Sequence, residues 1–153
     1  MIASITCNGT LSGTLKPRTV FHDIESALNT LILTAVGSTP VAWENVKYEP
    51  SVGTAFIQVF HVPLRTSPMS LGYGGYTDHR GVVQLNMCVP SDFGTLAAIL
   101  LADKMTGTIR RGIVTTYNSV PVRISAISVG SMDIQKAWAI LPVTINWQCY
   151  LPD

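Results

Sequence analysis

The chain has 153 residues and a formal net charge of +1, and 12% of its residues are charged, against about 25% in an average soluble domain. Its length suits one domain, and its near-neutral charge lacks the basic excess that marks nucleic-acid-binding domains. Apolar residues make up 47% of the chain. The longest unbroken apolar run, LAAILLA at 96–102, is still far below the about 18 residues that a membrane-spanning helix needs. The start, MIASITCNGT, also lacks the basic and apolar regions of a secretory signal.

The shortage of charge leaves two interpretations open. Interfaces in permanent oligomers are more apolar than ordinary surface and are depleted of charge at their cores. The composition therefore favours a permanent oligomer, and a monomer with a large core also fits it.

The three cysteines, Cys7, Cys88 and Cys149, are widely spaced and form no CxxC pair. No histidine lies near them at the spacing of metal ligands. We therefore expect reduced thiols in a cytosolic setting, and neither a metal nor another cofactor.

Residues 1–18 are rich in Thr, Ser and Gly and are interpreted as an arm or a short strand. A helix is predicted over 20–36, where apolar residues recur along one stripe. Thr19 is placed to cap its start, and Gly37 is placed to stop it.

The stretch VAWENVKYEPSVG at 41–53 contains two glutamates, which raises the question of an acid-base site. Glu44 and Glu49 are five positions apart in a strand-and-turn segment, so their spacing does not bring them together. Asn45 favours a turn, and Pro50 holds Glu49 extended. The stretch is interpreted as a structural connection.

A strand with apolar residues on both faces is predicted over 54–62, and an alternating strand over 82–89. The segment between them, 63–81, is rich in Gly, Pro and Ser and is predicted to be a long loop. Loops of this length are often functional, so Tyr73, Tyr76 and Arg80 are candidate residues for docking a partner.

A second helix is predicted over 91–106, with Ser91 as its N-cap and Gly107 at its end. Between Leu96 and Ala102 it is apolar all round, so we expect it to be buried on more than one side, by the sheet and by a second subunit. Candidate interface residues come from this helix and from the strand at 54–62. They are Leu96, Ile99, Leu100, Phe56 and Phe60.

A hairpin is predicted to join 112–117 to 120–127 through Asn118 and Ser119. The final strand region alternates regularly from Ala137 to Cys149. Pro142 removes a ladder donor within it, which implies an edge position, a bulge or two separate strands.

The order of elements does not alternate strand and helix, so an α+β fold is favoured. We expect a mostly antiparallel or mixed β-sheet packed by the helices at about 20–36 and 91–106. Residues 19–153 are predicted to form a single domain.

Two further patterns bear on function. Asp78, His79 and Cys88 would suit a small enzyme or ligand-binding domain only if the fold gathered them into one pocket. Arg110 and Arg111 form the one adjacent basic pair and are candidates for a surface that faces a polyanion.

The order of four stretches resembles a known family. They are VAWENVKYEP after the first helix, RGVVQLNMCVP, SDFGTLAAILLADKM, and AWAILPVTINWQC at the end. Together they resemble the tail terminator proteins of long, non-contractile-tailed bacteriophages, including a related phage-associated domain family first described without a function. The resemblance runs from about residue 20 to residue 150.

This resemblance implies a non-enzymatic α+β protein that assembles as a homohexameric ring on the head-proximal end of the tail tube. Such a ring stops polymerisation of the tube protein and offers its other face to head-completion or connector proteins. DNA passes its lumen without specific binding, and Arg110 and Arg111 are candidate lumen cations. The expected location is the virion, after assembly in the host cytoplasm and with no membrane. Another neck component, such as a head-tail joining or tail-completion protein, is the alternative.

Within this picture we expect Leu100→Asp to abolish both folding and ring formation, because the second helix is predicted to be buried on more than one side.

Overall fold

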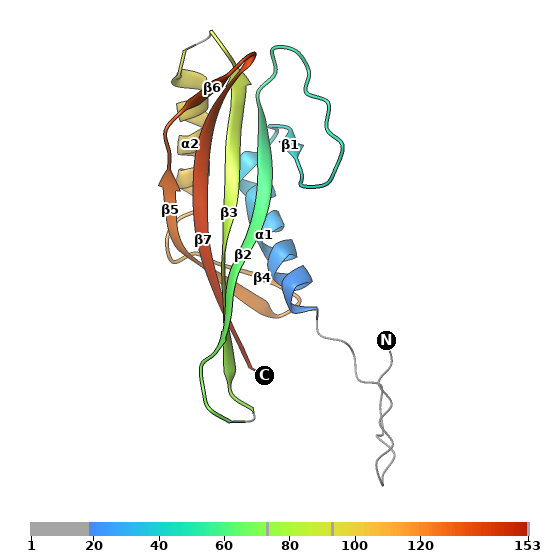
Figure 1. Cartoon of the computed structure of the whole chain (residues 1–153), viewed down its shortest axis with the longest axis vertical. Coiled ribbons are helices and arrows are strands. Elements are labelled where there is room, and N and C mark those ends of the chain that lie inside the picture. Colours follow the sequence, from blue (N-terminus) through green and yellow to red (C-terminus); the bar gives the residue numbers. More distant parts are fainter. Residues whose placement is uncertain (1–18, 73, 93, 153) are drawn as a thin grey trace.

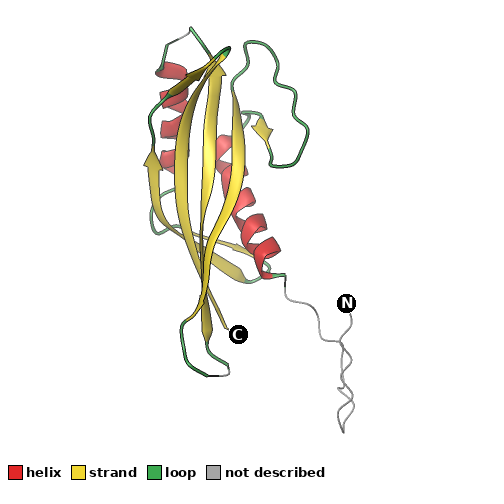
Figure 2. Cartoon of the chain, viewed as in Figure 1, coloured by secondary structure: helices red, strands yellow, loops and turns green. Residues whose placement is uncertain are grey.

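The computed structural model describes residues 19–72, 74–92 and 94–152. They form one long, twisted sheet with two helices packed against one of its faces (Figure 1, Figure 2). The α+β prediction is confirmed. The elements in chain order are α1 (Val20–Val36), β1 (Val41–Ala42), β2 (Phe56–Pro68), β3 (Tyr76–Pro90), α2 (Leu96–Thr108), β4 (Val114–Tyr117), β5 (Val120–Val129), β6 (Asp133–Gln135) and β7 (Trp138–Pro152).

The strand order in the sheet is β1-β2-β3-β7-β5-β4, and β6 pairs with the start of β7. β1 pairs parallel to β2, and the other pairings are antiparallel. β3 and β7 are the two central strands and pair along their whole length, from Tyr76 opposite Pro152 to Pro90 opposite Trp138.

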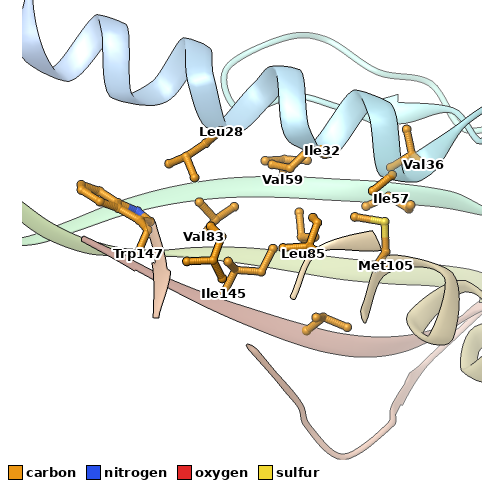
Figure 3. Close-up of a cluster of buried hydrophobic side chains, with 14 of the residues drawn as sticks. Leu28, Ile32, Val36, Ile57, Val59, Val83, Leu85, Met105, Ile145 and Trp147 are labelled. Atoms are coloured by element: carbon orange, nitrogen blue, oxygen red, sulfur yellow. The ribbon is translucent and has the colours of Figure 1, made fainter. Parts of the chain in front are cut away.

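The core lies between the sheet and the two helices. In β7 every second residue from Ala139 to Leu151 is buried, as the alternating sequence predicted. Leu28 and Ile32 of α1 lie over β2, β3 and β7, and Met105 of α2 closes the other end of the same cluster (Figure 3).

Helix α1 begins and ends where the sequence predicted. Thr19 occupies the N-cap position, but its hydroxyl donates to the Asp23 carboxylate (3.1 Å), and its oxygen accepts no hydrogen bond from the backbone N–H groups of the first turn. Gly37 ends the helix with a positive φ of 63°, a conformation that glycine adopts without steric cost.

The predicted long loop at 63–81 is wrong. β2 continues to Pro68 and β3 begins at Tyr76, so only the connection between them is irregular. A bulge between Pro63 and Arg65 interrupts the pairing. This part of the hairpin extends beyond the helices (Figure 1), so neither face needs a regular apolar pattern, and the sequence shows none.

The predicted start of the second helix at 91 is also wrong, since α2 begins at Leu96 and ends at Thr108. The Ser91 hydroxyl donates to the Lys136 carbonyl (3.1 Å), and its N–H donates to the Ala137 carbonyl (2.9 Å). These bonds hold Ser91 beside the β6–β7 turn, at the end of β3. Asp92 and Gly94 then have positive φ values of 72° and 77°, which a right-handed helix excludes.

Pro142 lies in a continuous central strand, so the predicted edge, bulge or break at that position is wrong. Its carbonyl accepts from the Gly130 N–H (2.8 Å). The proline nitrogen therefore faces the gap between the end of β5 and the start of β6, where no ladder donor is required. The hairpin at Asn118 and Ser119 is confirmed, with φ values of 49° and 64° that suit a type I′ turn.

Candidate interaction surfaces

The structure separates the residues of the possible enzyme pocket. Asp78 and Cys88 lie on the same strand, ten positions apart, which corresponds to about 33 Å. Asp78 and His79 are neighbours in a strand and point to opposite faces. Burial raises the pKa of the Cys88 thiol to about 11, so it is held as the unreactive thiol. These three residues do not form one site.

The two glutamates of the 41–53 stretch have different partners and do not form one site. The Glu44 carboxylate accepts the backbone N–H of His61 (3.2 Å), and Glu49 pairs with Lys47 at the surface (2.8 Å). Asn45 has a positive φ of 57° and turns the chain. The stretch is a structural connection, as predicted.

No group of three or more His, Cys, Asp or Glu residues in the described part of the chain is arranged to hold a metal ion. Among the same residues, no helix has the length and apolarity to cross a membrane.

The 41–53 stretch forms one wall of a groove on the face of the sheet opposite the helices. The groove has a volume of about 970 Å³, and the β6–β7 turn bounds its other side. Its charged lining residues are Glu44 and Lys136. We call it the aromatic groove, after the five aromatic side chains that line it: Trp43, Tyr48, Phe56, Phe60 and Trp138.

The candidate interface residues Phe56 and Phe60 both line this groove. Phe56 is only 5% exposed, because its ring packs between Tyr48 and Trp138 with ring centroids 5.0 Å apart on each side. It therefore forms the floor of the groove, whereas Phe60 is exposed. Trp43, Tyr48 and Trp138 were not singled out from the sequence, although the concentration of aromatic residues in VAWENVKY was a signal.

The other three candidate interface residues lie together on the outer side of α2. Leu96, Ile99 and Leu100 are 67%, 44% and 57% exposed. They are spaced i, i+3 and i+4, so they share one helix face, which we call the α2 ridge. Within the single chain only Ala98, Ala102 and Met105 of this helix are buried. The core thus covers one side of it, and the expected burial of another side by a second subunit stays a prediction.

The tip of the β2–β3 hairpin is a third exposed apolar surface. Leu64, at the bulge in β2, is exposed, and so are Met69, Leu71 and Tyr76 at the end of the hairpin. The first three were not singled out from the sequence, where they appear as isolated apolar residues in a polar segment. Tyr73, also a candidate docking residue, lies outside the described residues.

Arg80, the third candidate docking residue, is tied to its own strand. Its Nε donates to Asp78 Oδ2 (2.6 Å), and this hydrogen bond with the nearby carboxylate charge raises the pKa of Arg80. Asp78 is buried, and its Oδ1 accepts no hydrogen bond from the described residues. Arg110 and Arg111 are both exposed between α2 and β4.

The outer edge of β2 is not open to strand addition. Ile57 donates its N–H outward to the Pro40 carbonyl (3.0 Å), and His61 donates outward to Glu44. Alternate residues of β2, with odd numbers, direct their N–H groups to this edge. Pro63, which follows His61 in this pattern, has no N–H, and the bulge comes directly after it. Prolines and bulges of this kind protect edge strands from pairing with other chains. At this edge, contacts with other proteins are therefore expected to use side chains and not backbone strand pairing.

A family model for phage tail terminator proteins matches residues 23–147. The chain belongs to the phage tail terminator family. The resemblance identified in the sequence is therefore confirmed, and the protein is a structural component of a phage tail, with a place in the virion.

Two solved structures share the fold of this terminator. One chain, which carries no descriptive name, is 21% identical with a TM-score of 0.66, and the match covers 85% of this chain and 92% of that one. The other is a chain from the virion of a native gene transfer agent particle, 14% identical with a TM-score of 0.53, and covers 90% and 100% respectively. A search of curated proteins finds no match.

Proposed function

We propose that this terminator forms a homohexameric ring that caps the head-proximal end of the tail tube. In this role it stops polymerisation of the tube protein, offers its other face to head-completion or connector proteins, and lets DNA pass through its lumen. Residues 19–153 act as one ring-forming domain, preceded by an arm at 1–18. The protein performs no catalysis and uses no cofactor.

Membership of the terminator family carries this proposal. Exposed apolar surface supports it, because large apolar patches on a folded chain mark interaction sites. A subunit in a capping ring needs two lateral contacts with its neighbours and axial contacts with the tube and the head. The aromatic groove, the α2 ridge and the hairpin tip supply three separate surfaces for these contacts.

The hairpin tip suits an axial contact. It projects along the long axis of the molecule, past the ends of both helices (Figure 1). Leu64, Met69 and Leu71 would meet the tube or the head there, with Tyr73, Tyr76 and Arg80 as further contacts. Arg110 and Arg111 are proposed to face the lumen, where two cations per subunit in a near-neutral chain would not hold DNA tightly.

The experiment is to polymerise the tube protein of the same virus with and without this terminator, and to measure tube lengths by electron microscopy. We expect shorter tubes of narrow length distribution, each closed by a ring at one end. Light scattering after size-exclusion chromatography gives the number of subunits in that ring. A protein that forms rings but leaves tube growth unchanged would instead be another neck component.

A further inference from the structure

We propose that the aromatic groove of one subunit receives the α2 ridge of the next subunit around the ring. The inference rests on the proposed ring and specifies the residues that form its lateral contact.

The two surfaces match in chemistry and shape. The groove is concave and aromatic, and Glu44, one of its two charged lining residues, is already engaged by the His61 N–H. The α2 ridge is convex and consists of three aliphatic side chains on one helix face. A helix that places i, i+3 and i+4 anchors into an apolar groove is a recurring mode of recognition.

The two surfaces also lie where a ring requires them. The 41–53 stretch with β1 and helix α2 are on opposite sides of the sheet's long axis (Figure 1). A contact between two different surfaces of identical subunits is heterologous, and it closes into a ring when the rotation between subunits permits. The groove lies on the sheet face opposite the helices and the ridge lies on helix α2, so they are two separate surfaces, and each subunit can bind one neighbour at each.

The hairpin tip fits the groove less well than the α2 ridge does. The hairpin tip points along the long axis and not toward a lateral neighbour (Figure 1). Strand pairing at the β2 edge beside the groove is blocked by Pro63 and the bulge. Of these surfaces of a second copy, the α2 ridge is therefore the one that the groove accommodates better.

Cysteine cross-linking tests the contact in the full chain. Val46 lines the groove and is exposed, so a V46C/L100C variant with Cys7→Ser places one thiol on each proposed surface. The two native cysteines that remain, Cys88 and Cys149, are buried. A short bis-maleimide should then link successive subunits into a ladder that ends at the size of the ring.

The matched control is V46C/L33C, also with Cys7→Ser, because Leu33 is an exposed aliphatic residue on α1. This variant should form rings but give no ladder. Rings measured by light scattering without a ladder in V46C/L100C would overturn the groove-ridge contact while leaving the ring intact. A failure of the unmodified protein to form rings, alone or on the tube, would overturn the proposed function itself.

A third variant, V46C with Cys7 retained, tests the arm at 1–18 as the occupant. We expect the peptide map of the ring to show no link between Cys7 and the thiol introduced by V46C. A prominent link between these two positions would show that the arm fills the groove, and the inference would then be wrong.

Discussion

The two helices of this terminator use their apolar residues differently. Helix α1 is amphipathic, and its apolar stripe, with Leu28 and Ile32, is buried against the sheet. Helix α2 is apolar on all sides between 96 and 102, yet it buries mainly small residues in the core and leaves Leu96, Ile99 and Leu100 exposed. Helix α1 therefore places its apolar stripe in the core, whereas α2 leaves three aliphatic side chains exposed on one face, which we propose serve assembly.

The largest effect on folding is expected in α1. Leu28→Ala removes a side chain that is almost fully buried and should lower the free energy of unfolding by about 2–5 kcal/mol. Leu100→Ala on the exposed ridge of α2 should change it by less than about 0.5 kcal/mol. Urea unfolding under conditions that keep both variants monomeric measures the difference. Equal losses would contradict the division between the helices.

The sheet surface beneath α1 should be nearly as sensitive. A Cβ at Gly81 would clash with the Trp147 indole and lie 2.9 Å from the Val62 carbonyl oxygen, so Gly81→Ala should cost about 1–3 kcal/mol. This glycine belongs to the RGVVQLNMCVP stretch that carries the family resemblance, and the absence of a side chain there lets the Trp147 indole approach β3 closely.

Gly107 in α2 is the matched control for this substitution. A Cβ there meets no atom within 4 Å, and alanine favours a helix over glycine by up to about 1 kcal/mol. Gly107→Ala should therefore leave stability unchanged or increase it. Thermal unfolding of the two alanine variants compares them directly, and a loss at Gly107 equal to that at Gly81 would contradict the packing argument.

A smaller effect should appear on lowering the pH, through the contact between α1 and β2. His61 Nε2 lies 2.8 Å from Asn29 Oδ1. Burial lowers the pKa of His61 below its usual 6.5, although the negative charges of Glu25 and Glu44 act in the opposite direction and raise it. The unfolded chain therefore binds the proton more readily, so this contribution to stability is present above about pH 6.5 and declines as the pH falls below it.

His61→Gln keeps a hydrogen-bonding side chain and removes the titration. The difference in unfolding free energy between the unmodified protein and this variant should be constant above about pH 7. Toward about pH 5 the unmodified protein should lose stability relative to the variant. A difference that is independent of pH over this range would show that His61 does not titrate with folding.

The smallest effect on folding, and the largest on assembly, is expected at Leu100. The sequence predicted that Leu100→Asp abolishes folding, but the exposure of this side chain in the single chain removes the reason for that expectation. We expect a folded variant with a normal circular dichroism spectrum that forms no rings by light scattering. Leu33→Asp on α1 should be folded and should still form rings, and an equal loss of rings in both variants would contradict the role of the ridge.

Local patterns in the sequence determined much of this protein. Alternation in 137–149 predicted β7, the apolar stripe predicted α1, and Asn118-Ser119 predicted the turn between β4 and β5, because each depends on residues close together in the chain. The order of the four family stretches also led to the terminator family, since such stretches can be compared without knowing the fold.

Only the tertiary structure decided the features that depend on distant partners. Arg65 to Pro68 contain no strand pattern, and they extend β2 because Thr77 to Arg80 pair with them. Ser91 resembles an N-cap, but it is held at the end of β3 because Lys136 and Ala137 accept its hydrogen bonds. An apolar run such as LAAILLA predicts burial, but it does not indicate which part of the protein, or which partner, covers the side chains. Which side chains the sheet covers depends on how the helix packs, and that packing leaves Leu96, Ile99 and Leu100 exposed.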